Sequence, residues 1–162
     1  MTTYREPNAI KNVTDFTRLF WAYEGKVAHL PPRSICDLRV NLIQEELNEL
    51  KEAINKKDLV EVADALADIQ YVLSGTIIAF GLQDQFADIF DEVQRSNMSK
   101  ACNTENEAEA TVKHYEVNKN TEGYVKKKEG KFIVYRKEDD KVLKSVNYSP
   151  ANLKQFINKI TN

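Results

Sequence analysis

Two consecutive segments, residues 34–57 and 59–81, limit most strongly what this chain can fold into. The first segment repeats apolar residues at helical spacing: Ile35, Leu38, Leu42, Ile43, Leu47, Leu50 and Ile54. The second is apolar on nearly all sides, which predicts a helix at the buried centre of a helical bundle. Because only a short link near residues 56–58 separates them, we expect an antiparallel helical hairpin.

Both segments carry acidic residues at helical spacing. Glu46 and Glu49 project within roughly 60° of each other on the first predicted helix, and Glu61 and Asp64 repeat that spacing on the second. An antiparallel hairpin can bring the two pairs face to face, so that four carboxylates converge on one volume. Such a cluster repels itself unless a cation occupies it, and hard oxygen ligands select Mg²⁺ or Mn²⁺.

A magnesium site of this kind predicts a reaction at a phosphate group. Mg²⁺ usually keeps several waters and takes its remaining ligands from substrate phosphates, which indicates attack of metal-activated water on a phosphoric anhydride. Glu45 points about 100° away from Glu46. We therefore predict that Glu45 orients or deprotonates the attacking water, or reaches a second metal.

Each acidic residue taken alone also has a simpler interpretation. A solvated helix face that continues to Lys56 explains three of them: Glu45, Glu49 and Glu52. Asp58 and Glu61 fit a capping box. Asp64 and Asp68 resist such interpretations because their neighbours are apolar, and the conjunction of all these residues favours the metal site.

Composition excludes several other classes of function. The 162 residues carry a formal net charge of -2, so no general basic field draws the chain to nucleic acid or to an anionic membrane. The N-terminal residues have no signal-peptide pattern, and polar residues interrupt the longest apolar run, residues 69–82. Two cysteines are too few for a disulfide framework. We expect a cytoplasmic protein with neither a nucleic-acid nor a membrane partner.

The predicted fold is all-α, with a four-helix-bundle-like core and a small C-terminal β-hairpin or meander. A helical core covers residues 1–100, a polar helical or linker segment follows at 101–123, and residues 124–162 form the hairpin and a short terminal helix of the same domain. We expect the first helix to be capped at Thr14 or Asp15, the fourth to start at Asp84, and the last to span residues 152–160.

The acidic pattern resembles a known signature. E-E-x-x-E followed by E-x-x-D is typical of the all-α NTP pyrophosphohydrolase superfamily, which includes MazG-like, dimeric dUTPase-like and phosphoribosyl-ATP pyrophosphohydrolase-like proteins. RVNLIQ before the first half and ADIQYVLSGT after the second half also resemble the family, so the likeness covers about residues 14–100. It implies hydrolysis of a nucleotide between its α and β phosphates in a homodimer or homotetramer. The resemblance further implies these Mg²⁺ ligands: Glu46, Glu49, Glu61 and Asp64.

The segment RSNMSK resembles the part of such proteins that holds the substrate. Arg95, Asn97 and Lys100 supply cationic and amide donors that suit phosphate oxygens. These basic residues have an equally good structural explanation: they lie at the C-terminus of a helix, where the helix dipole favours positive charge. Arg39 is a weaker candidate for phosphate contact. Phe20 and Trp21 could stack on a base, although aromatic residues on a short helix more often belong to a core.

The leading hypothesis is Mg²⁺-dependent hydrolysis of a nucleoside triphosphate or deoxynucleoside triphosphate to the monophosphate and pyrophosphate. One alternative is hydrolysis of phosphoribosyl-ATP. The other is a non-catalytic helical binding protein whose carboxylates hold a structural cation.

Overall fold

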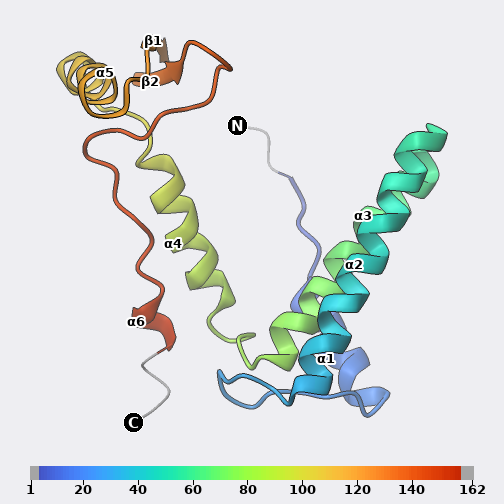
Figure 1. The fold of residues 1–162 in the computed structure, drawn as a ribbon. Coiled ribbons are helices and arrows are strands. Elements are labelled where there is room, and N and C mark those ends of the chain that lie inside the picture. Colours follow the sequence, from blue (N-terminus) through green and yellow to red (C-terminus); the bar gives the residue numbers. More distant parts are fainter. Residues whose placement is uncertain (1–3, 158–162) are drawn as a thin grey trace. The chain divides into compact units, whose positions relative to one another are not determined.

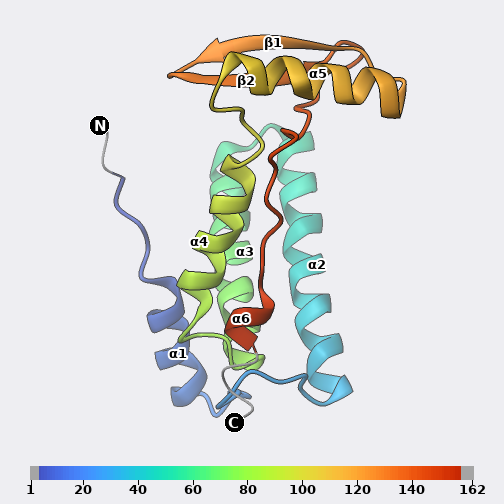
Figure 2. The same cartoon turned by 90° about the vertical axis from the view of Figure 1, so that its left-hand side faces the viewer.

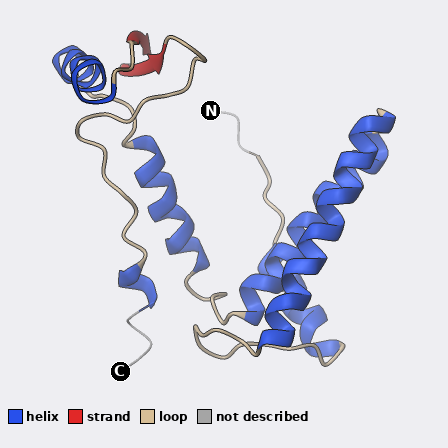
Figure 3. Cartoon of the chain, in the orientation of Figure 1, coloured by secondary structure: helices blue, strands red, loops and turns tan. Residues whose placement is uncertain are grey.

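A computed structural model describes residues 4–157 and shows a mostly helical chain with one β-hairpin near its C-terminal end (Figures 1 and 3). The predicted fold class is confirmed in these terms. The described residues form two compact units, residues 4–86 and 87–157, and each is described by itself below. The domain limits expected at residues 100 and 123 remain a prediction.

Three helices build the first unit: α1 (Ala9–Leu19), α2 (Arg33–Lys56) and α3 (Leu59–Ala79). The predicted helical hairpin is present, because α2 and α3 pack along each other in antiparallel directions (Figures 1 and 2). Lys57 ends α2 in a left-handed conformation, and the Asp58 carboxylate accepts hydrogen bonds from the backbone N–H groups of Val60 and Glu61. The link therefore has only these two residues.

α1 packs against α3. Val13 and Thr17 of α1 are buried, and the ring of Phe16 meets that of Tyr71 edge-on at 5.6 Å. α1 begins at Ala9, so the expected cap at Thr14 or Asp15 is wrong. The Thr14 hydroxyl instead donates to the Ile10 carbonyl oxygen inside the helix.

The expected burial of α3 holds only for its second half. Five residues near its C-terminal end are buried: Ser74, Gly75, Ile77, Ile78 and Ala79. Nearer the start of the helix, Leu59, Val60 and Leu66 are 78%, 76% and 52% exposed in the single chain. The physical reason is that α1 and the loop after it reach only the C-terminal half of α3.

That loop, residues 20–32, is fastened to the end of α3. The Gly25 N–H donates to the Ile78 carbonyl and the His29 N–H donates to the Phe80 carbonyl. Gly81 has φ +67°, and a Cβ there would lie 2.0 Å from the Val27 carbonyl oxygen. Only glycine fits this position without a shift of the loop.

α3 is long and apolar enough to cross a membrane when length and composition alone are considered. Core helices of soluble proteins pass the same test. The helix also carries Glu61, Asp64 and Asp68, and carboxylates inside a bilayer are costly.

The second unit comprises nearly all of α4 (Phe86–Met98), then α5 (Glu105–Lys119), the strands β1 (Gly123–Lys128) and β2 (Lys131–Arg136), and α6 (Lys154–Ile157). The hairpin turns at Glu129 and Gly130, both with positive φ, as their sequence predicts. α5 packs on the hairpin around a small core: Cys102, Ala108, Val134 and Leu143. α4 starts two residues later than expected, and residues 158–160 of the predicted last helix lie outside the described residues.

After the hairpin the chain returns along α4 (Figure 1). The Ser145 N–H donates to the Lys100 carbonyl oxygen at 3.1 Å, and the Asn152 N–H donates to the Glu92 carboxylate at 2.8 Å. Between them, the hydroxyl groups of Tyr148 and Ser96 are 3.1 Å apart. These bonds hold residues 145–152, which we call the return segment, against α4.

Candidate functional site

The facing sides of α2 and α3 carry a row of charged residues. Glu46 of α2 lies near Asp68 of α3, and two turns away on α2 Arg39 lies against Gly75. The register of an antiparallel pair then places Glu49 near Asp64. The site is thus built by two packed helices, whose positions relative to each other are fixed along their whole length.

A hollow of about 290 Å³ opens at the end of this hairpin near the link. It is lined by Glu49, Glu52, Ala53, Lys56, Glu61, Asp64 and Ala65. Three of the four predicted metal ligands therefore share one concave surface. The other two charged residues of the hollow, Lys56 and Glu52, form an ion pair of 2.7 Å, as expected for a solvated helix face.

Glu46, the fourth predicted ligand, lies one turn from Glu49 and is half-buried. Burial raises the pKa of the Glu46 carboxyl, and four neighbouring carboxylates raise it further: Glu49, Asp68, Glu45 and Asp64. The carboxylates of α2 and α3 are thus close enough to repel one another electrostatically. Asp68 was not among the predicted ligands, although its position four residues after Asp64 could have indicated it.

The carboxylates do not close on a single point. Within residues 4–157, no three His, Cys, Asp or Glu side chains lie close enough together to hold a metal ion as they stand. The donor set still fits a hard divalent cation, since the acidic groups lining the hollow offer only carboxylate oxygens.

Arg39 lies at the other end of the charged row, about 10 Å along α2 from Glu46 at the usual helical rise. Its guanidinium packs over Gly75, with Nη1 2.8 Å from the position that a Cβ would take there. The Nε atom is buried and has no hydrogen-bond partner among the described residues. Burial lowers the pKa of Arg39. No ion pair among the described residues includes Arg39, so its charge is available to an anion.

The predicted phosphate-binding segment lies in the second unit. Arg95 is engaged there already: it forms a bidentate pair with Glu92 at 2.7 and 2.8 Å and donates to the Pro150 carbonyl. Asn97 accepts a hydrogen bond of 2.8 Å from Lys100 Nζ. Neither these contacts nor the carboxylate geometry tests the predicted roles of the site residues, which stay predictions.

The aromatic candidates for base stacking are on the surface. Trp21 is 95% exposed and Phe20 62% exposed, and Phe20 lies 4.4 Å from the ring of Phe16. Within the single chain, the interpretation as core residues is therefore wrong for both.

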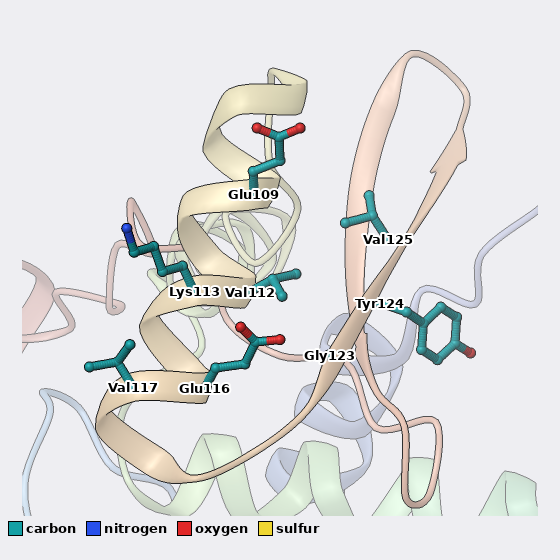
Figure 4. A pocket seen from close by; sticks show the side chains of 8 residues that line it. All are labelled: Glu109, Val112, Lys113, Glu116, Val117, Gly123, Tyr124 and Val125. Atoms are coloured by element: carbon teal, nitrogen blue, oxygen red, sulfur yellow. The ribbon is translucent and has the colours of Figure 1, made fainter.

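A larger hollow of about 550 Å³ lies between α5 and β1 (Figure 4). Val112 of α5 points toward the strand, whereas Tyr124 projects away from the helix (Figure 4). The rim of this hollow carries charges of both signs, from Glu109, Glu116 and Lys113. It contains no residue predicted for metal or phosphate binding, so the candidate site is the α2–α3 hairpin.

Comparison with known proteins identifies the family of the chain. The chain is 23% identical to the uncharacterized protein L479 of Acanthamoeba polyphaga mimivirus, in a match covering 90% of this chain and 94% of that protein. A family model described as phosphoribosyl-ATP pyrophosphohydrolase matches residues 13–97, just over half of the chain and nearly the whole of α1 to α4. The chain therefore belongs to the phosphoribosyl-ATP pyrophosphohydrolase family of the all-α, MazG-like superfamily, whose members are hydrolases acting on phosphoric anhydrides.

Proposed function

We propose that this protein hydrolyses a nucleoside triphosphate or deoxynucleoside triphosphate to the monophosphate and pyrophosphate, with Mg²⁺ as cofactor and Mn²⁺ as a possible substitute. Membership of the family supplies the reaction class, a pyrophosphohydrolase acting on a nucleotide-like substrate. The identity of the substrate and of the metal is what we propose.

One observation carries the proposal: acidic groups from α2 and α3 surround one hollow and raise the pKa of the Glu46 carboxyl. Surface carboxylates with a purely solvating role have no reason to gather where they repel one another. A divalent cation would turn this unfavourable arrangement into a favourable one.

We assign the metal ligands to Glu46, Glu49, Glu61 and Asp64, with Asp68 as a further carboxylate of the same cluster. A divalent cation lowers the pKa of bound water and neutralises charge on phosphate oxygens. Glu45 is exposed beside Glu46 and can accept a proton from the attacking water. Arg39 contacts the phosphate chain at the other end of the charged row, because no described carboxylate pairs with its charge.

Phosphoribosyl-ATP is the competing substrate, because it too is a nucleotide cleaved between its α and β phosphates. The experiment is pyrophosphate release from a panel of canonical and modified nucleoside triphosphates beside phosphoribosyl-ATP, with Mg²⁺ and with chelator. Release from phosphoribosyl-ATP alone would contradict the proposed substrate.

A non-catalytic role predicts metal-dependent melting and no product from any nucleotide. Membership of a hydrolase family argues against it. The same panel tests it, because metal-dependent product from any member excludes a purely structural cation.

We further propose that the protein works as a homodimer or homotetramer. Leu59, Val60 and Leu66 expose apolar surface on α3 beside the charged row, and Leu19 and Trp21 do so at the end of α1. Exposed apolar side chains on two neighbouring helices are what an interface between copies of the chain would bury. A second copy of the chain is the occupant that would bury it beside the candidate site.

A further inference from the structure

The two strands of the β-hairpin differ in what borders them. β2 has neighbours on both sides, because β1 pairs along one edge and residues 102 and 141–143 bond to the other. Phe132 of β2 exchanges both of its backbone hydrogen bonds with Cys102, at 2.8 and 3.0 Å. The backbone groups of Phe132 therefore point away from β1, and those of the next residue, Ile133, point toward it.

This alternation decides which backbone groups of β1 are free. Lys126 lies opposite Ile133, so the even-numbered residues of β1 form the hydrogen-bonded pairs of the hairpin. The N–H and C=O groups of Val125 and Lys127 then point to the outer side of β1. Among the described residues, no backbone–backbone hydrogen bond outside the hairpin uses them. β1 thus presents an open strand edge.

The hollow between α5 and β1 lies beside this open edge (Figure 4). Its lining, as the structure describes it, includes no residue of β2, which places the hollow on the outer side of β1. Val112 and Val117 contribute to the α5 wall, and Val125 contributes to the β1 wall. Val117 and Val125 are exposed in the single chain. A third strand beside β1 would cover this apolar surface with every second side chain.

Three consecutive lysines set the charge of the open edge: Lys126, Lys127 and Lys128. No ion pair within residues 4–157 includes any of them. Lys126 Nζ lies 5.1 Å from the centroid of the Tyr124 ring, and Lys127 Nζ lies 5.2 Å from that of Phe132. A second copy of the chain would bring an identical lysine run to the edge, which like charges oppose. Charge complementarity instead favours a partner that carries carboxylates.

We propose that β1 binds an extended acidic segment of another protein as a third strand of the hairpin. The backbone of that segment hydrogen-bonds with Val125 and Lys127 along the open edge. Its apolar side chains enter the hollow beside α5, and its carboxylates pair with the lysines at residues 126–128. Because the apolar part of β1 precedes these lysines, an antiparallel segment carries its acidic residues before its apolar ones.

The first test uses a fluorescent peptide of three glutamates followed by valine, threonine and valine, the antiparallel match to residues 123–128. Fluorescence anisotropy measures its binding to the full chain in the presence of chelator. One control peptide has the same side chains but N-methylated backbone amides, which cannot donate hydrogen bonds. A second control peptide has lysines in place of the glutamates.

Protein variants locate the binding on β1. A double variant, Lys126→Glu with Lys128→Glu, reverses the charge of the open edge. Lys141→Glu is the matched control, because Lys141 is exposed at the opposite edge of the hairpin. Circular dichroism checks that each variant is folded.

We expect wild type to bind the acidic peptide and to bind its N-methylated form at least about tenfold more weakly, because the main-chain hydrogen bonds are lost. The double variant should also bind the acidic peptide at least about tenfold more weakly and should prefer the lysine peptide, while Lys141→Glu behaves as wild type. Three results overturn the proposal: no binding by wild type, equal binding of the N-methylated peptide, or unchanged binding by the double variant.

Hydrogen exchange followed by NMR tests the geometry of strand addition. The amides of Val125 and Lys127 should exchange rapidly in the free chain and at least about tenfold more slowly with saturating acidic peptide. The Lys126 amide, which bonds within the hairpin, should be protected in both states and is the internal control. Protection of Val125 that appears at high protein concentration without peptide would assign the edge to a second copy and overturn the proposal. Neither measurement involves metal or turnover, so both are independent of the proposed function.

Discussion

The Arg39 guanidinium lies directly on Gly75, with Nη1 2.8 Å from the place that a Cβ of residue 75 would occupy. Val13 approaches the same position from α1, at 3.7 Å. The three helices of the first unit therefore meet at a residue without a side chain. This close approach holds a half-buried arginine in line with the acidic row on α2 and α3.

Arg39→Met should lower kcat/KM about tenfold to a hundredfold, the loss expected when one charge-assisted contact to phosphate is removed. Its free energy of unfolding should stay within about 1 kcal/mol of wild type or rise, because the methionine replaces an unpaired, half-buried cation. Gly75→Ala should lower kcat/KM in the same direction, since a methyl group at residue 75 displaces the guanidinium. Steady-state kinetics and urea denaturation measure both quantities. If Arg39→Met loses much stability but keeps its kcat/KM, Arg39 has a purely structural role and does not contact phosphate.

The helical hairpin and its cap could be predicted from the sequence because their signals are local. The apolar stripe of α2, the acidic spacing on both helices and Asp58 before α3 each concern residues within one or two turns. The hairpin turn at Glu129 and Gly130 was predictable for the same reason.

Features that depend on packing between distant segments could not be predicted in this way. Asn8 makes no side-chain cap at the start of α1, so no local signal marks that helix end. Exposure of the first half of α3 depends on how far α1 and its loop extend. The approach of Tyr148 to Ser96 of α4 requires the whole course of the return segment, which no spacing in the sequence reveals.

Glu46→Gln should change how stability depends on pH and metal. A carboxyl whose folded pKa is raised contributes stability below its usual pKa of 4.5 and loses it as pH rises through the raised value. Metal-free wild type should therefore lose stability above pH 4.5 relative to Glu46→Gln. The difference at pH 7 should be no more than about 1 kcal/mol, because the group is only half-buried.

Thermal unfolding between pH 5 and 8, with chelator and with Mg²⁺, measures this effect. Glu24, whose pKa is lowered to about 2 by Arg18 and Lys26, remains ionised throughout that range and does not interfere. Mg²⁺ should stabilise wild type and have a smaller effect on Glu46→Gln. Equal stabilisation of both proteins would remove Glu46 from the metal ligands.

Gly81→Ala should destabilise the first unit by about 2 kcal/mol or more, because its Cβ would overlap the Val27 carbonyl oxygen in addition to adopting a positive φ. Gly130→Ala is the matched control: φ there is +77°, but nothing lies within 4 Å of the new Cβ. It should cost only about 1 kcal/mol. Equal losses in urea denaturation would show that the loop after α1 is not fastened as described.

Leu66→Glu should dissociate the proposed oligomer, because a charge would enter the apolar surface of α3 that a second copy buries. Light scattering coupled to size-exclusion chromatography reports the mass directly. Val117→Glu places the same change on an exposed position of α5 and should leave the mass unaltered. If wild type is already monomeric at the concentrations that support activity, the oligomer proposal fails.

The most direct test of the central claim is pyrophosphate release from a responsive nucleotide by wild type, Asp64→Asn and Glu52→Gln, each with Mg²⁺ and with chelator. Glu52 lines the same hollow but pairs with Lys56, which makes it the matched control. We expect metal-dependent release by wild type and by Glu52→Gln, and a loss of at least a hundredfold in folded Asp64→Asn. Retained activity in Asp64→Asn, or activity that survives the chelator, would contradict a metal-dependent reaction at this carboxylate cluster.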